Sequence, residues 1–107
     1  MSNTEVYAVT GSTGFLGEHF LRYFAERLSC VSGVLLLHKK WSPFIPKNWK
    51  MEIAPFDDVA ELALSLRGVT TILHLSGVTH ADFGDEYWRG NVESTKNLVE
   101  AARKAAV

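Results

Sequence analysis

Three evenly spaced glycines near the start of the chain carry its clearest chemical signal. Gly11, Gly14 and Gly17 stand three residues apart, with Ser12 and Thr13 between the first two. A glycine at a strand end permits a tight turn, a second lets the backbone approach a phosphate, and a third lets the next helix pack closely. A helix beginning near Gly14 would present free N–H groups to an anion, and the two hydroxyls would add donors. The pattern predicts a phosphate-binding loop rather than a simple turn, formed by Gly11, Ser12, Thr13, Gly14, Phe15, Leu16 and Gly17.

Strands and helices alternate around this loop. Residues 6–10 are an apolar run typical of a strand buried on both faces, and apolar residues then recur at helical spacing over 14–28. Two prolines indicate a loop over 41–50. Asp57 or Asp58 can cap a helix that ends near Leu66. The predicted strands are 6–10, 31–37, 51–54 and 69–75, and the last predicted helix is 91–106. This order predicts a parallel α/β sheet with right-handed crossovers, in one domain spanning 1–107.

The composition argues against several classes of function. The chain has 107 residues and a net charge of −1, which gives no general attraction to nucleic acid or to anionic membranes. No apolar stretch approaches the ~20 residues of a membrane span. Residues 1–5 lack the basic start of a signal peptide. Cys30 is the only cysteine, so no internal disulfide can form, and we expect a cytoplasmic protein.

Other polar and aromatic residues are explained without catalysis or metal. His74 lies in an apolar run, and we expect a core histidine with satisfied hydrogen bonds. A group of irregularly spaced polar residues is expected to be a solvated loop, so no metal site is predicted; it comprises His80, Asp82, Asp85 and Glu86. Several aromatic residues could form a ligand rim, cover the sheet or make a protein interface; they are Trp41, Phe44, Trp49, Phe83 and Trp88.

Four stretches, in order, resemble a single family. Residues 9–17, Val-Thr-Gly-Ser-Thr-Gly-Phe-Leu-Gly, look like the start of an extended short-chain dehydrogenase/reductase of the NAD(P)-dependent epimerase/dehydratase group. Residues 58–69, 72–77 and 91–102 are similar to later segments of that family. The resemblance covers nearly the whole chain. It implies a partial doubly wound Rossmann fold with a four-stranded parallel sheet of order 3-2-1-4.

The resemblance also implies roles for single residues. The glycine loop would hold the pyrophosphate of NAD or NADP. Leu75, Ser76 and Gly77 would lie along the ribose and phosphates. Asn91 would be structural and tie a helix to a neighbouring strand.

The adenosine end of the cofactor departs from the family pattern. Pro55 stands where the family usually has an acidic residue beside the adenine, so contact would rely on the Phe56 backbone or on Asp57. At the end of the second strand, an acidic residue favours NAD and basic residues favour NADP. That position holds His38, Lys39 and Lys40, which favours NADP over NAD.

The catalytic pair of the family is missing from this sequence. The family uses Tyr-x-x-x-Lys, in which the lysine lowers the pKa of the tyrosine for proton exchange. Tyr7, Tyr23 and Tyr87 are instead followed four residues later by Gly11, Arg27 and Asn91. We therefore expect a domain that stops before the fifth strand, has no catalytic residue and is inactive alone. A cofactor-free interaction or regulatory domain, or one chain of a two-chain oxidoreductase, remain alternatives.

The expected fold leaves the fourth strand without its usual neighbour. A bare strand edge and an uncovered helix face around Leu98 and Val99 would invite pairing with another chain. We expect a homodimer or a complex with a second polypeptide.

Overall fold

The computed structural model of the chain describes residues 5–38, 41–75 and 88–107, with the backbone alone at 88–90. Its centre is a sheet of four parallel strands in the order β3-β2-β1-β4. The strands are β1 (Val6–Thr10), β2 (Ser32–Leu37), β3 (Trp49–Ile53) and β4 (Thr71–His74). The predicted Rossmann-type order is confirmed, and the first strand has the predicted bounds. Thr10 lies between Leu36 and His74 at the carboxyl end of the sheet.

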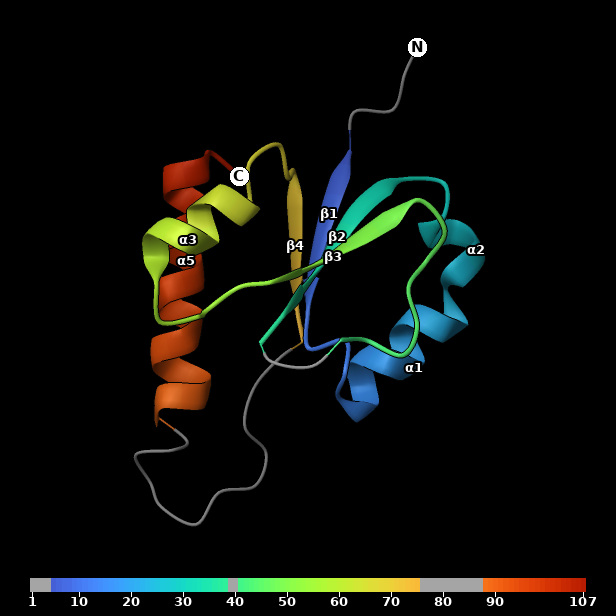
Figure 1. The fold of residues 1–107 in the computed structure, drawn as a ribbon, viewed down its shortest axis with the longest axis horizontal. Coiled ribbons are helices and arrows are strands. Elements are labelled where there is room, and N and C mark those ends of the chain that lie inside the picture. The colour runs from blue at the N-terminus through green and yellow to red at the C-terminus, as the bar shows by residue number, and fades with distance from the viewer. Residues whose placement is uncertain (1–4, 39–40, 76–87) are drawn as a thin grey trace.

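Helices cover both faces of this sheet (Figure 1). Helices α1 (Phe15–Tyr23) and α2 (Ala25–Leu28) lie on one side, and α3 (Val59–Ser65) and α5 (Ser94–Ala105) lie on the other. A π-helical segment, η1 (Trp88–Glu93), leads into α5. No helix in the described part of the chain is both long and apolar enough to cross a membrane.

Each face of the sheet has its own core. On the α1 side, Leu21 and Leu28 pack with strand residues and with Trp49; on the other side, Leu62 and Leu66 of the α3 segment pack with Leu98 of α5. Leu98 is therefore buried, and the prediction of an uncovered helix face is wrong at that position, because its side chain points to the α3 side of the core. Val99, one residue later, is exposed.

The predicted helix 14–28 and the predicted loop 41–50 do not have the predicted extent. The predicted helix 14–28 breaks at Phe24, whose φ of −104° and ψ of 19° leave the helical region. The break lets both Leu21 and Leu28 reach the sheet, and apolar spacing reports only which residues face the core. The predicted loop 41–50 ends early, since Trp49 already begins β3. The Trp49 indole N–H donates to the Leu28 and Val31 carbonyls, at 2.8 and 3.1 Å.

Candidate functional site

The glycine loop joins the carboxyl end of β1 to the start of α1. Gly11 has a φ of +79°, a left-handed conformation that favours glycine. The Gly14 N–H donates to the Gly11 carbonyl at 3.1 Å and closes the turn, and the Glu18 N–H donates to the Gly14 carbonyl at 2.9 Å to begin the helix. No side chain caps the start of α1 at Gly14. The loop therefore brings uncapped backbone N–H groups to the carboxyl end of the sheet.

Gly17 is a glycine because the fold leaves no room for a side chain. A Cβ built there would overlap the Gly11 carbonyl oxygen and would lie 2.7 Å from the Gly11 carbonyl carbon. The first turn of α1 thus packs directly on the loop backbone. This is the role predicted for the third glycine.

Gly14 is different, because nothing among the described residues requires a glycine there. Its φ of −83° suits any residue, and an added Cβ would meet only the Gly11 carbonyl oxygen at 3.5 Å, an ordinary contact. The position is exposed. A glycine that the fold does not need, at the start of an uncapped helix, is what close approach of a phosphate to the backbone would require.

The two hydroxyl residues of the loop have opposite environments. The Thr13 side chain is exposed, as are those of Phe15 and Leu16. Ser12 is fully buried, and its Oγ has no hydrogen-bond partner among the described residues. Thr13 is thus placed to reach a ligand at the surface, whereas the Ser12 hydroxyl lies beneath the loop.

A chain of short hydrogen bonds connects this loop to the end of β4. Thr10 Oγ1 lies 2.7 Å from His74 Nδ1, and His74 Nε2 lies 2.9 Å from Thr95 Oγ1 on α5. The Leu75 N–H donates to both Thr10 Oγ1, at 3.1 Å, and the Thr10 carbonyl, at 3.2 Å. Burial lowers the pKa of His74 below its usual 6.5, because desolvation penalises the charged imidazolium. The predicted histidine with satisfied hydrogen bonds at a strand end is confirmed, and its side chain is half-buried rather than in the core.

The ends of β2 and β3 meet at a second part of the candidate site. The His38 ring stands edge-on to the Phe56 ring, with centroids 6.4 Å apart. The Phe56 side chain is buried in the core, and its carbonyl accepts a hydrogen bond from Asn97 Nδ2 at 3.0 Å. Asp57 is exposed, while Asp58 caps α3 by accepting the Glu61 N–H at 3.1 Å.

Asn97 has a role that the sequence did not predict. The Asn97 amide ties α5 to the segment after β3, and the structural role predicted for Asn91 stays a prediction. Asn97 belongs to the same Asn-Val-Glu-Ser-Thr-Lys-Asn-Leu segment, so the motif held the signal. Four predicted site residues, Lys39, Lys40, Ser76 and Gly77, lie outside the described residues.

The predicted aromatic group does not form one surface. Trp49 is buried and fills the space above Gly33, where a Cβ would overlap its ring, so its interpretation as part of a ligand rim is wrong. Phe44 lies on the loop before β3 under Arg22, whose guanidinium carbon is 5.0 Å from the ring centroid. Trp41 is exposed. Phe83 and the side chain of Trp88 lie outside the described structure, as do His80, Asp82, Asp85 and Glu86. Within the described ranges, no three potential metal ligands come together.

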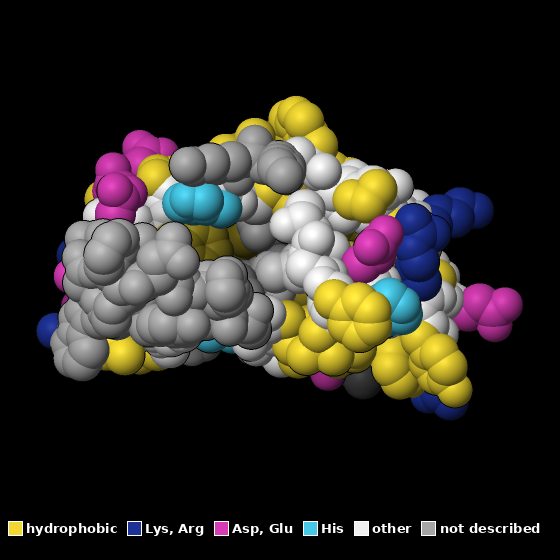
Figure 2. Space-filling view, turned by 90° about the horizontal axis from the view of Figure 1, so that it is seen from below, with side chains coloured by type: hydrophobic (Ala, Val, Ile, Leu, Met, Phe, Trp, Pro, Cys, Tyr) yellow, Lys and Arg dark blue, Asp and Glu magenta, His cyan; other side chains and the backbone are white. Residues whose placement is uncertain are grey.

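The edge of the molecule that carries the glycine loop is seen in Figure 2. Hydrophobic side chains reach the surface on the side where α1 lies. Among the large hydrophobic residues of α1, Phe15 and Tyr23 have the largest exposed fractions, at 81% and 84%. A ligand at the loop would therefore have both backbone donors and apolar side chains beside it.

The comparisons with known proteins agree with this geometry. The model of the NAD dependent epimerase/dehydratase family matches residues 7–107. The chain belongs to this family. Uncharacterized protein 052L of Frog virus 3 is 32% identical over 110 residues, which covers 94% of this chain and 30% of the viral protein.

Two solved structures have folds similar to that of this chain. Uronate dehydrogenase from Agrobacterium tumefaciens has a TM-score of 0.74 at 27% identity and covers 95% of this chain and 37% of that protein. MoeE5 in complex with UDP-glucose and NAD also has a TM-score of 0.74 at 27% identity, with coverage of 96% and 33%. The chain thus spans about a third of the length of the proteins it matches.

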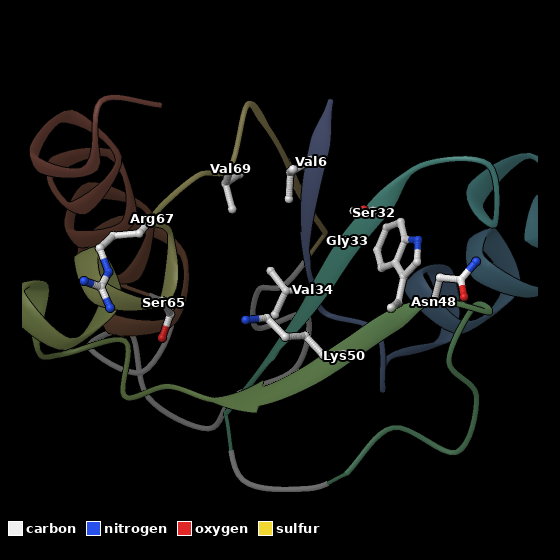
Figure 3. Close-up of a pocket in the computed structure, with 10 residues that line it drawn as sticks. Val6, Ser32, Gly33, Val34, Asn48, Lys50, Ser65, Arg67 and Val69 are labelled. Atoms are coloured by element: carbon white, nitrogen blue, oxygen red, sulfur yellow. The ribbon is translucent and has the colours of Figure 1, made fainter. Parts of the chain in front are cut away.

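A cleft also lies at the opposite end of the sheet, where strands β1, β2 and β3 begin (Figure 3). Val6, Val34 and Val69 contribute apolar side chains to it, and Lys50 and Arg67 contribute basic ones. Its volume is about 240 Å³, which is below the ~300–1,000 Å³ of ordinary ligand pockets. Lys50 also pairs with Glu52 at 3.6 Å. The cleft is therefore a weaker candidate than the glycine loop.

Proposed function

We propose that this chain binds a nicotinamide dinucleotide, with the pyrophosphate on the Gly11–Gly17 loop and the N-terminus of α1. The observation that carries the proposal is Gly14, an exposed glycine that the fold itself does not require. Membership of the NAD-dependent family and the likeness to MoeE5 in complex with NAD support it.

The test is a calorimetric titration of the chain and of Gly14→Ala with NADP, NAD and ADP. Gly14→Ala places a methyl group where the phosphates approach, so affinity is expected to fall about tenfold or more. Its free energy of unfolding is expected to stay within about 0.5 kcal/mol of the parent, since the added Cβ makes only an ordinary contact. Heat signals that are equal for parent and variant would contradict the proposed binding mode.

We propose NADP as the preferred cofactor. His38 lies exposed at the end of β2, and Lys39 and Lys40 follow it in the sequence. A 2′-phosphate carries charge that basic side chains pair with, whereas the 2′-hydroxyl of NAD gains nothing from them. A parent chain that binds NAD more tightly than NADP would overturn this preference.

We also propose that cofactor binding is what residues 1–107 contribute to chemistry, because the Tyr-x-x-x-Lys pair is absent from their sequence. No binding of any of the three nucleotides would favour a cofactor-free interaction domain. The observation behind that alternative is the exposed apolar surface of α1, with Phe15, Leu16 and Tyr23.

The partner prediction also stands as a proposal. Strand β4 is at one edge of the sheet formed by the described strands, so its outer edge can pair with a strand of a second copy or of another polypeptide. Sedimentation of the chain at several concentrations tests the homodimer, and a constant monomer mass would contradict it.

A further inference from the structure

A hydrogen-bond chain runs from Thr95 through His74 to Thr10, the residue that precedes the glycine loop. It joins three elements that are distant in sequence, namely α5, β4 and β1. Thr10 is fully buried and immediately precedes Gly11. A buried hydroxyl fixed by two partners leaves the backbone around it little freedom.

The network has a direction. The Thr10 hydroxyl accepts the Leu75 N–H and lies within hydrogen-bond distance of His74 Nδ1, to which it can donate its proton. In that arrangement a neutral imidazole accepts at Nδ1 and donates from Nε2 to the Thr95 hydroxyl. The orientation of the Thr10 hydroxyl then depends on the imidazole, and so does the hydrogen bond that this hydroxyl accepts from the Leu75 N–H.

We propose that His74 is a positioning residue of the dinucleotide site, which acts through the Thr10 hydroxyl to hold Leu75 and the end of β4 against the Gly11 turn. The proposal rests on the proposed cofactor binding and on the position along the ribose and phosphates that the family resemblance implies for Leu75. His74 does not itself touch the ligand in this role. The Nδ1 bond to Thr10 is the one that matters for binding, and the Nε2 bond to Thr95 anchors the ring.

Two substitutions of His74 separate the two bonds. The side-chain amide of Asn occupies the position of Nδ1, and that of Gln reaches the position of Nε2. His74→Asn therefore keeps a partner for Thr10, and His74→Gln keeps a partner for Thr95. Thr10→Val and Thr95→Val remove the corresponding hydroxyls with little change in shape, and Thr10→Ser restores the hydroxyl at the first position.

The measurements are the dissociation constant for NADP, the urea unfolding midpoint, and the amide hydrogen exchange of Leu75. His74→Gln and Thr10→Val are expected to weaken binding about fivefold or more, while His74→Asn, Thr95→Val and Thr10→Ser stay within about twofold of the parent. Leu75 exchange is expected to accelerate in the first pair only. All the substitutions that remove a bond lower the unfolding midpoint, so stability alone does not separate the groups.

The outcomes distinguish this inference from the proposed function. A parent that binds no dinucleotide overturns the proposed function, and this inference with it. A parent that binds, with affinities that are equal in His74→Asn and His74→Gln or that follow the unfolding midpoint across all variants, overturns the positioning role alone.

Discussion

The two halves of the candidate site are built in different ways. At the loop after β1, the backbone defines the site: Gly11 adopts a positive φ, and Gly17 lets α1 pack against the loop. At the ends of β2 and β3, side chains define the site, through the His38–Phe56 contact and the Asn97 tie to the Phe56 carbonyl. Backbone geometry tolerates few residue types, whereas side-chain contacts tolerate many. Under the proposed binding mode, the fold therefore fixes the half that holds the pyrophosphate, and side chains at the adenosine half set the choice of cofactor.

The largest expected effect is a loss of stability caused by a substitution in the loop after β1. Gly17→Ala forces a Cβ into the Gly11 carbonyl, which is backbone and cannot rotate away, so we expect the free energy of unfolding to fall by about 3 kcal/mol or more. Urea denaturation followed by circular dichroism measures it. Gly14→Ala is the matched control and should unfold like the parent. Equal losses for the two variants would contradict the division of roles between these glycines.

The second prediction changes the charge of an exposed residue in the adenosine half. His38→Glu places a carboxylate at the exposed end of β2, where it repels a 2′-phosphate and accepts hydrogen bonds from a ribose hydroxyl. The ratio of NADP to NAD affinity should fall about tenfold. His38→Gln, which carries no charge, should change the ratio much less. Paired titrations with the two cofactors give the ratio, and an unchanged ratio in His38→Glu would place the 2′ position elsewhere.

The same contrast explains what the sequence could predict. The glycine spacing and the alternating apolar runs are local patterns, and they predicted a parallel α/β sheet, the bounds of β1 and the loop between β1 and α1. The strand order came from the resemblance to the family. The break at Phe24 and the burial of Trp49 depend on how side chains share the space over the sheet, which no spacing in the chain reports. The Asn97 tie is likewise a contact between residues 41 positions apart. Local geometry was predictable, and contacts between distant segments were not.

The third prediction concerns a buried hydroxyl without a described partner in the loop after β1. Ser12 Oγ is buried without a described partner, and a buried unpaired hydroxyl costs free energy. Ser12→Ala should therefore raise the free energy of unfolding of the ligand-free chain by about 1 kcal/mol. Ser42→Ala is the matched control, because the buried Ser42 hydroxyl donates to the Phe44 carbonyl at 2.7 Å and its loss should destabilise. A lower stability for Ser12→Ala would show that the hydroxyl is paired in solution.

The smallest expected effect concerns the titration of His74, at the end of β4 between Thr10 and Thr95. Burial lowers its pKa in the folded chain below the 6.5 of an exposed imidazole. Below pH 6.5 the unfolded chain therefore binds more protons than the folded chain, so stability falls as the pH decreases from 6.5 toward the folded pKa and is constant above this range. Urea midpoints of the parent should drop between pH 7.5 and 5.5 by more than those of His74→Asn, which lacks the imidazole. Parallel pH profiles would mean that the imidazole is as well solvated in the folded chain as in the unfolded one, and a rise toward low pH would mean that the network prefers the protonated ring.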